Sequence, residues 1–375
     1  MSANRIKALA VTDYLGRGNV NPFRPEAAQL IGLQASGQVD VTVMCSPESV
    51  LVKYYDERGI ATVGHKIKGK LSLRSIRFIR SYIRDNGIEI LHLFHSRAIS
   101  NGLLAAIGLP VKVIIYRGQE GSLKRYDPVS YLNALSPRAD RVVCVAVAVE
   151  RYVRKQLWAN PDKAITIYKG HSLDWYQQPP ADLSEWQLPD NALKVALVAN
   201  LRPRKGLPVL IEATRHLPPE APVHFLLMGA NTEDPDVQAL VAQAAAPERI
   251  HLLGYRDDAP EVVAACDVII LPTTKREGLS RAIIEGMAYG RPAVVSDTGG
   301  NAELVADGES GYVVPASDPA ALAAALESLW RSPEQREAFG REAQRRIRDI
   351  FTVEQGIAKH LQLYQQLAAE LRQGG

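Results

Sequence analysis

The sequence predicts an α/β protein with two doubly wound parallel sheets, and three observations lead to that class. The length of 375 residues exceeds what one hydrophobic core usually organises, so two domains are favoured. Short apolar runs alternate with helix-like segments, as in parallel sheets covered by helices. The alternation stops at a polar stretch with two prolines, residues 177–182, and then restarts. We therefore predict Rossmann-like domains at 1–178 and 179–352, a deep cleft between them, and a C-terminal helix at 353–375 that packs back across the hinge.

The apolar runs give the expected strands, because they are short, continuous and bounded by polar segments. In the first domain they lie at 6–11, 40–44, 90–94, 111–116, 141–145 and 164–168. In the second domain they lie at 194–198, 224–228, 250–253, 268–271, 293–295 and 311–314.

The composition, 46% hydrophobic and 23% charged, is ordinary for a soluble globular protein. Three cysteines in apolar contexts predict buried free thiols and a reducing compartment: Cys45, Cys144 and Cys266. No run approaches the roughly 18 apolar residues that a membrane span needs. The N-terminus leads straight into an expected strand, without the pattern of a signal peptide. We therefore expect a cytoplasmic protein, peripheral on the inner face of the plasma membrane if it meets a bilayer.

The net charge of +3 is divided unevenly along the chain. Residues 1–178 hold 25 Lys and Arg against 14 Asp and Glu, a difference of +11, whereas the remainder holds 19 against 27, a difference of −8. This asymmetry indicates that the first domain faces an anionic partner.

The segment from Lys66 to Arg84 concentrates this positive charge, with seven Lys and Arg and no acidic residue. Apolar residues recur in it every three or four positions, with arginines displaced by one: Leu73, Ile76, Ile79 and Ile83. Such a helix fits an anionic membrane surface or an anionic acceptor. The same pattern also fits a helix that packs on the core and exposes a solvated basic face.

Two glutamates, Glu277 and Glu285, follow an apolar strand that ends at residue 271. Glu277 lies in the loop after the strand, and Glu285 lies about two helical turns further on. Ligands of open α/β sheets bind at the carboxyl ends of strands, so both carboxylates are candidates to accept hydrogen bonds from sugar and ribose hydroxyls.

Two other loops of the second domain are suited to phosphate. After the strand at 194–198, a basic turn with Arg202 and Lys205 runs into a helix, which combines cations with free backbone N–H groups. After the strand at 293–295, Gly299 and Gly300 would let the backbone approach a phosphate closely.

Together these segments resemble retaining glycosyltransferases of family 4, which have the GT-B fold. Four motifs carry the resemblance, in the family's order and at its spacing: RPRKG at 202–206, LGYRDD at 253–258, EGLSRAIIEGMAYGRPAVVS at 277–296 and TGGNAELVADGESGYVVP at 298–315. The similarity is close from 194 to 329. The first half resembles the family more loosely, through its strand–helix pattern, a glycine loop and ADRVVCVA at 139–146.

The resemblance implies a role for each matching residue of the second domain. Glu277 would contact the donor sugar and Glu285 the ribose of the nucleotide. Arg202 and Lys205 would neutralise the diphosphate, and Arg256 would lie near the base. Backbone groups would also touch the donor, at Gly278, Leu279, Ser280 and Gly300.

In the first domain, the resemblance implies that Gly16 and Gly18 lie in the loop that approaches the diphosphate and the acceptor. Two positions depart from the family's pattern. Asn200 stands where an arginine is usual, so Arg202 is expected to substitute. Arg117 stands where many members have a histidine near the transferred sugar, which leaves the donor sugar undefined.

The family's mechanism is a front-face displacement in which the leaving phosphate takes the acceptor's proton. Arg202, Lys205 and Glu277 would then be the catalytic residues, with charge stabilisation on the diphosphate as the main term. The family generally needs no metal, and the sequence has no His/Cys ligand cluster. Asp257–Asp258 is a weak metal candidate, for which a solvated loop is the favoured interpretation. No metal or cofactor is therefore expected.

The leading hypothesis is transfer from a UDP-linked sugar to a glycan acceptor such as lipopolysaccharide core or another lipid-linked surface polysaccharide. The alternatives are a sugar-nucleotide 2-epimerase, a phosphorylase, and a transferase that acts on a small soluble acceptor. A nucleic-acid-binding protein is disfavoured, because aromatic residues are only 6% and the second half is acidic.

Overall fold

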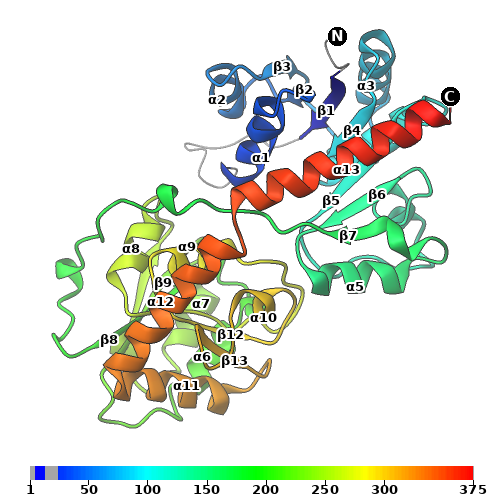
Figure 1. The fold of residues 1–375 in the computed structure, drawn as a ribbon. Helices are drawn as coiled ribbons and strands as arrows, with labels where there is room; N and C mark the ends of the chain where they lie inside the picture. The colour runs from blue at the N-terminus through cyan, green and yellow to red at the C-terminus, as the bar shows by residue number, and fades with distance from the viewer. Residues whose placement is uncertain (1–4, 13–23, 375) are drawn as a thin grey trace. The chain divides into compact units, whose positions relative to one another are not determined.

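The computed structural model describes residues 5–12 and 24–374. The chain forms two compact units, Met1–Gly170 with Phe351–Gly375, and His171–Ile350. Each unit is a parallel sheet with helices against it (Figure 1). The chain passes between units at Gly170 and again at Ile350, whereas the sequence prediction put these boundaries at 178 and 352.

The first unit has a seven-stranded sheet in the order β3-β2-β1-β4-β5-β6-β7. Its strands are β1 (Ile6–Val11), β2 (Val39–Cys45), β3 (Ala61–Gly64), β4 (Ile90–Leu93), β5 (Lys112–Arg117), β6 (Arg141–Cys144) and β7 (Ala164–Thr166). The six predicted strands are present, and β3 is an additional one at the edge. Because β1 pairs in parallel with both β2 and β4, the strand order reverses between β1 and β4.

Helices cover both faces of this sheet. They are α1 (Arg24–Ala35), α2 (Leu51–Asp56), α3 (Leu73–Asn86), α4 (Ser96–Ala105), α5 (Val147–Gln156) and α13 (Val353–Gln373), with short 3₁₀ helices η2 (Pro128–Leu132) and η3 (Pro161–Lys163). One core holds side chains of α1, α2 and α13, and another holds side chains of α3 and α4.

Helix α3 resolves one alternative left open by the sequence. Ile79 and Ile83 are buried in the core beneath the helix, and Ile76 packs against it. Ser72 caps the first turn by accepting a hydrogen bond from the N–H of Ser75. Most of the apolar stripe therefore belongs to the first unit's core and is not a free membrane-facing surface.

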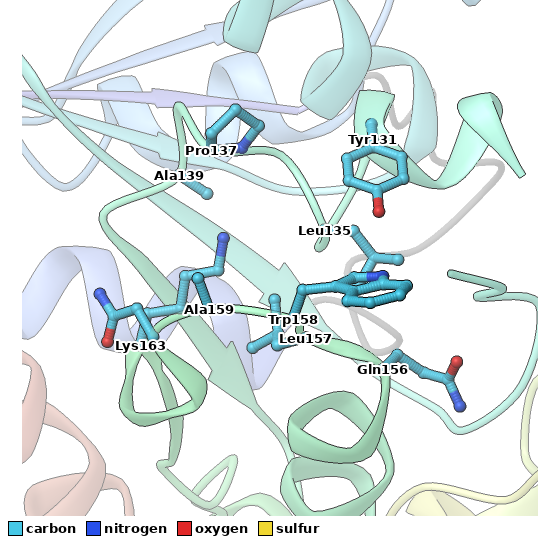
Figure 2. Close-up of a pocket in the computed structure, with 10 residues that line it drawn as sticks. Tyr131, Leu135, Pro137, Ala139, Gln156, Leu157, Trp158, Ala159 and Lys163 are labelled. Atoms are coloured by element: carbon cyan, nitrogen blue, oxygen red, sulfur yellow. The ribbon is translucent and has the colours of Figure 1, made fainter. Parts of the chain in front are cut away.

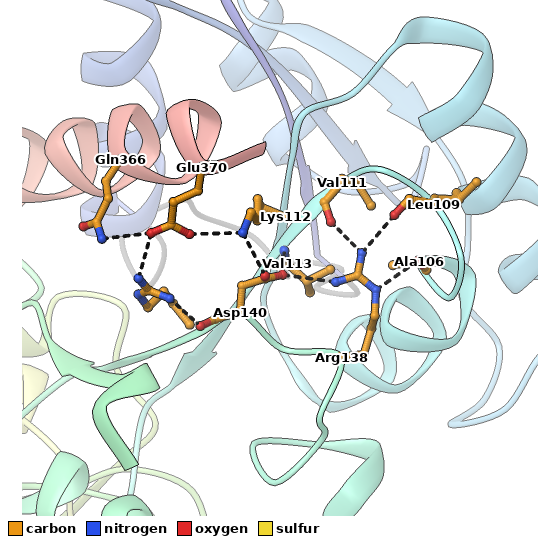
Figure 3. Close-up of polar contacts among 10 residues, drawn as sticks. Ala106, Leu109, Val111, Lys112, Val113, Arg138, Asp140, Gln366 and Glu370 are labelled. Atoms are coloured by element: carbon orange, nitrogen blue, oxygen red, sulfur yellow. Dashed lines mark hydrogen bonds and ion pairs between the residues drawn. The ribbon is translucent and has the colours of Figure 1, made fainter. Parts of the chain in front are cut away.

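The C-terminal helix α13 belongs to the first unit and is fastened to its sheet by ion pairs (Figure 3). Glu370 accepts hydrogen bonds from Lys112 at 3.0 Å and from Arg141 at 3.2 Å. Nearer the middle of the helix, Tyr364 and Leu367 are buried in the core. The helix thus completes one face of the first unit through both apolar and charged contacts.

The second unit has a six-stranded sheet in the order β10-β9-β8-β11-β12-β13. Its strands are β8 (Leu193–Val198), β9 (Val223–Met228), β10 (Ile250–Gly254), β11 (Val268–Leu271), β12 (Ala293–Ser296) and β13 (Gly311–Val314). Its helices are α6 (Leu207–Ala213), α7 (Pro235–Val241), α8 (Ala259–Ala265), α9 (Arg281–Ala288), α10 (Asn301–Leu304), α11 (Pro319–Arg331) and α12 (Pro333–Asp349), and its 3₁₀ helices are η4 (Leu173–Trp175), η5 (Ser184–Trp186), η6 (Pro203–Lys205) and η7 (Pro247–Arg249). All six strands are those that the sequence predicts.

All three cysteines are buried and unpaired, as the sequence predicts. Within residues 5–12 and 24–374, no helix combines the length and apolar character needed to cross a bilayer.

Candidate functional site

The second sheet reverses its strand order between β8 and β11. The loops that follow β8, β11 and β12 meet beside this point, at the edge of the sheet formed by the carboxyl ends of the strands. The N–H of Thr274 donates to the carbonyl of Arg204 at 2.9 Å, which ties the loop after β11 to the loop after β8. The N–H of Gly300 donates to the carbonyl of Gly278 at 3.0 Å, which ties in the loop after β12. A switch point of this kind is where open α/β sheets bind their ligands.

Two glycines allow these loops to approach each other closely. Gly206 has φ of 90°, and a Cβ atom there would lie 1.9 Å from the carbonyl oxygen of Pro272. Gly299 has φ of 61°, and its Cβ would lie 2.3 Å from the carbonyl oxygen of Glu277. Both the left-handed backbone and the short distances require glycine at these positions. Gly299 therefore fixes the loop that carries Glu277, a role that the sequence did not indicate.

Glu277 and Lys205 form an ion pair at the centre of this edge. The Nζ atom of Lys205 lies 2.6 Å from Oε2 of Glu277, and the side chains are 18% and 11% exposed. The hydroxyl of Thr273 donates to the same carboxylate oxygen at 3.1 Å. Arg276, just before Glu277, has a positive φ of 62°, a strained conformation for a residue with a side chain. The chain thus holds a carboxylate and an ammonium group in fixed positions at a strained turn.

Arg202 lies at the start of the same turn but is held differently. Its carbonyl accepts a hydrogen bond from the N–H of Lys205 at 2.8 Å, whereas its side chain is exposed. Among the residues that the structure describes, its guanidinium has no hydrogen-bond or ion-pair partner. The site therefore offers one anchored cation and one with open hydrogen-bonding capacity.

Glu285 lies in α9 and is only 8% exposed. Arg281, one turn earlier, approaches its carboxylate at 3.2 Å. Burial raises the pKa of Glu285 to about 7, against the opposing charge of Arg281 and with a further rise from the nearby Glu261. Glu261 comes from α8 and has a buried Oε2 atom without a hydrogen-bond partner in the described chain. Glu261 was not predicted, because no sequence motif or spacing links it to Glu285.

The other predicted donor contacts of this unit lie around the start of α9 and after β10. Ser280 caps α9, since its hydroxyl accepts from the N–H of Ile283 at 3.5 Å, and Gly278 and Leu279 precede it. Arg256 follows β10, which the sheet order places two strands from β8, and its guanidinium binds both oxygens of Asp258 at 2.8 and 2.7 Å. The structure thus brings together the loops of Lys205, Glu277 and Gly300, and places Arg256 at the edge strand.

The described residues contain no group of three or more His, Cys, Asp or Glu side chains arranged to hold a metal ion. Asp258, one of the two aspartates of the weak metal candidate, is bound by Arg256, whose hydrogen bonds lower the pKa of the Asp258 carboxyl.

A cavity of about 470 Å³ lies within the first unit at the carboxyl ends of β4 and β5. Lys70, His95 and Arg117 are among its lining residues. Arg117 donates to the carbonyl of Gly121 through Nη2, its Nε has no partner among the described residues, and burial lowers its pKa. His95 has φ of 65° and precedes α4. The cavity is therefore cationic; the predicted Gly16 and Gly18 lie outside the described residues.

Two family comparisons cover the two units. Residues 28–175 match the family described as Glycosyltransferase Family 4, and residues 180–346 match Glycosyl transferases group 1. The chain is 33% identical to the D-rhamnosyltransferase WbpZ of Pseudomonas aeruginosa over 51% of its own length, and this match spans about half of that relative. It is 29% identical to the phosphatidyl-myo-inositol mannosyltransferase of Mycobacterium leprae over 84% of this chain and 85% of the relative.

Among solved structures, the chain is similar to Anabaena Alr3699/HepE in complex with UDP, with a TM-score of 0.77 and 19% identity. The similarity covers 97% of this chain and 100% of that chain. At this level of identity the match concerns the fold, and it agrees with two Rossmann-like domains of the GT-B type.

Proposed function

The chain belongs to the group 1 and family 4 glycosyltransferases, and on that premise we propose that it is a retaining hexosyltransferase using a UDP-linked sugar. The observation that carries the proposal is the ion pair of Lys205 and Glu277 at the switch point of the second sheet. UDP as the nucleotide is suggested by the similarity to HepE, whose structure contains UDP.

The donor would bind along the loops after β8, β11 and β12. Glu277 would accept hydrogen bonds from hydroxyls of the sugar, and Glu285 from those of the ribose. The diphosphate would meet Arg202 and Lys205, whose positive charges match its negative charge. Backbone N–H groups around Ser280, at the start of α9, would complete the phosphate site.

The proposed reaction is the front-face displacement that the resemblance to the family implies. The bond between the anomeric carbon and the diphosphate oxygen breaks, and the acceptor oxygen bonds to the same face of that carbon. The acceptor's proton passes to the departing diphosphate. Negative charge grows on the diphosphate as the bond breaks, so Arg202 and Lys205 stabilise the transition state more than the ground state.

The acceptor is proposed to be an anionic glycan, such as lipopolysaccharide core or a lipid-linked surface polysaccharide. The first domain's excess of positive charge and the cationic cavity with Lys70 and Arg117 support this choice. The mannosyltransferase relative carries a phosphatidyl-inositol acceptor in its name, which is also an anionic lipid.

A contact with the anionic inner leaflet is proposed for the start of α3 and the segment just before it. Leu71 and Leu73 are 62% and 71% exposed, and basic residues surround them in the sequence, at Lys68, Lys70 and Arg74. Exposed leucines among cations suit a negatively charged bilayer surface. Binding to anionic vesicles should exceed binding to neutral vesicles and weaken as salt rises; equal binding to both would count against this contact.

A thermal-shift screen of UDP-, GDP- and ADP-sugars tests the donor proposal, because a ligand that binds the native state raises its stability. A shift with UDP-sugars that is lost in Glu285→Ala is expected. The absence of a shift with every nucleotide sugar would remove the donor assignment. Release of UDP with an epimerised free sugar, in the absence of any acceptor, would favour the epimerase alternative.

A further inference from the structure

A second cavity of the first unit, of about 570 Å³, differs in character from the cationic one. Its lining is mainly apolar and comes from η2, the segment after η2 and the residues that follow α5: Tyr131, Leu135, Pro137, Ala139, Leu157, Trp158 and Ala159. Figure 2 shows Tyr131, Leu135 and Trp158 gathered on one side of it. Its volume lies within the range of roughly 300–1,000 Å³ found for small-molecule sites.

The aromatic rings at this cavity are unusually open to solvent. The side chain of Trp158 is 66% exposed, and Tyr126, whose ring centroid lies 6.1 Å from that of Trp158, is 86% exposed. Tyr131, which lines the cavity, is 37% exposed. Large apolar side chains gathered at a cavity mark a binding site more often than they do when scattered singly.

Positive charge lies next to Trp158, one of the residues that line the cavity. The guanidinium carbon of Arg125 lies 5.6 Å from the centre of the Trp158 ring, and Arg125 donates to the carbonyl of Lys155. The Lys155 side chain is exposed. The ammonium group of Lys163 does not contribute in the same way, because it is buried and donates to the carbonyl of Ser136 at 2.6 Å.

The 3₁₀ helix η2 separates this apolar cavity from the cationic one. Val129 and Ser130 line the cationic cavity, whereas Tyr131 lines the apolar one. A single molecule with a charged head and a hydrocarbon chain would therefore find a suitable surface on each side of η2.

We propose that the apolar cavity holds the hydrocarbon chain of an anionic lipid-linked acceptor, with its phosphate at Arg125 and its glycan directed to the cationic cavity. This inference rests on the proposed transferase function, whose acceptor it narrows to a lipid phosphate. The alternative, a shallow contact of the same aromatic residues with the membrane, is an outcome of the test.

Dodecyl phosphate, kept below its micelle concentration, is the probe, and inorganic phosphate is the control without a chain. Calorimetric titration should give tighter binding of dodecyl phosphate than of inorganic phosphate. Trp158→Asp should weaken the binding of dodecyl phosphate by about tenfold, because a few apolar contacts are lost and each buried methylene contributes strongly to the binding free energy. Ile107→Asp is the matched control: Ile107 is 55% exposed in the same unit and does not line the cavity, so binding should be unchanged.

Ala159→Trp separates a chain site from a membrane surface. Ala159 is exposed, so a larger side chain can be accommodated without disturbing the core, yet it would fill the cavity. If the cavity binds the hydrocarbon chain, Ala159→Trp should lower the affinity for dodecyl phosphate about tenfold. If the aromatic residues instead contact a membrane surface, the variant should keep its vesicle binding, because that surface gains an aromatic group. Wild-type affinity for dodecyl phosphate in Ala159→Trp overturns the inference. Thermal shift with UDP-sugars on the same variants reports the second unit independently, so failure of the chain site and failure of the donor assignment are distinguishable.

Discussion

Replacing Lys205 with methionine should destabilise the second unit as well as impair catalysis. In the structure its ammonium group lies 2.6 Å from Glu277, in a pair whose side chains are 18% and 11% exposed. Loss of one partner from a fully buried pair costs roughly 3–5 kcal/mol, because the other charge is left uncompensated. Glu277 would keep hydrogen bonds from Thr273 at 3.1 Å and from the N–H of Gly278 at 3.4 Å. We therefore expect a smaller loss, about 2 kcal/mol in the free energy of unfolding.

A double-mutant cycle with Glu277→Gln measures this interaction. Each single variant should lose about 2 kcal/mol, and the double variant should lose at least about 1 kcal/mol less than the sum, because no unpaired charge remains. Urea unfolding followed by tryptophan fluorescence suits the assay, since three of the four tryptophans lie in the second unit, at Trp175, Trp186 and Trp330. Lys275→Met, in the same loop but exposed, is the matched control and should change stability little.

Turnover should respond differently from stability. Lys205→Met should lower kcat by about 10²- to 10³-fold, the usual effect of removing one group that stabilises developing negative charge. The double variant should recover stability but not turnover. Additive unfolding energies, within about 0.5 kcal/mol, would refute the coupled pair, and near-normal turnover in Lys205→Met would refute its role at the diphosphate.

Three further predictions concern pH and backbone geometry. Because the pKa of Glu285 is about 7 in the free protein and ribose hydroxyls would need its carboxylate form, UDP affinity should fall by up to about tenfold per unit as pH drops below 7; calorimetry on Glu285→Gln should show no such dependence. Burial lowers the pKa of His92, and lowers that of His360 to about 4, so unfolding exposes two groups that bind protons below about pH 6.5, whereas Glu285, with its raised pKa, binds a proton in the folded state over the same range and opposes them. Urea titrations should therefore show that His360→Gln loses about 1 kcal/mol less stability than wild type between about pH 6.5 and 5.5. Gly299→Ala should abolish most turnover, because its Cβ would collide with the carbonyl of Glu277; kinetics equal to wild type would contradict this.

The periodic part of the fold was predictable because apolar runs of parallel strands are continuous and buried on both faces. Strand β3 was missed because Ala61–Gly64 is four residues long and contains no buried residue, so it has no apolar pattern to detect. The helix at 73–86 was predictable from the spacing of its apolar residues, but whether these residues pack on the core or face a membrane was not. Only the packed structure assigns Ile79 and Ile83 to the core.

The site was predictable where chemistry is concentrated in one loop and unpredictable where it is assembled from several. Glu277 and Lys205 stand out by residue type and position, but their 2.6 Å contact joins residues far apart in the chain. Thr273, which donates to Glu277, has no sequence signal that separates it from any loop threonine. Gly299 was assigned to phosphate approach, yet the contact visible in the structure is with the backbone of Glu277.

Lys205 is paired with Glu277 whereas the side chain of Arg202 is exposed, and this difference predicts different roles for the two cations at the proposed diphosphate site. An ammonium group has three N–H donors, so Lys205 can keep Glu277 as a partner and still donate to a phosphate oxygen. Its position is then fixed before the donor arrives, and little reorganisation is needed as charge develops. The guanidinium of Arg202 is exposed and has no hydrogen-bond or ion-pair partner within residues 5–12 and 24–374, so in the proposed complex the donor would order it. Loss of Arg202 should therefore appear in turnover and leave unfolding unchanged, whereas loss of Lys205 should appear in both.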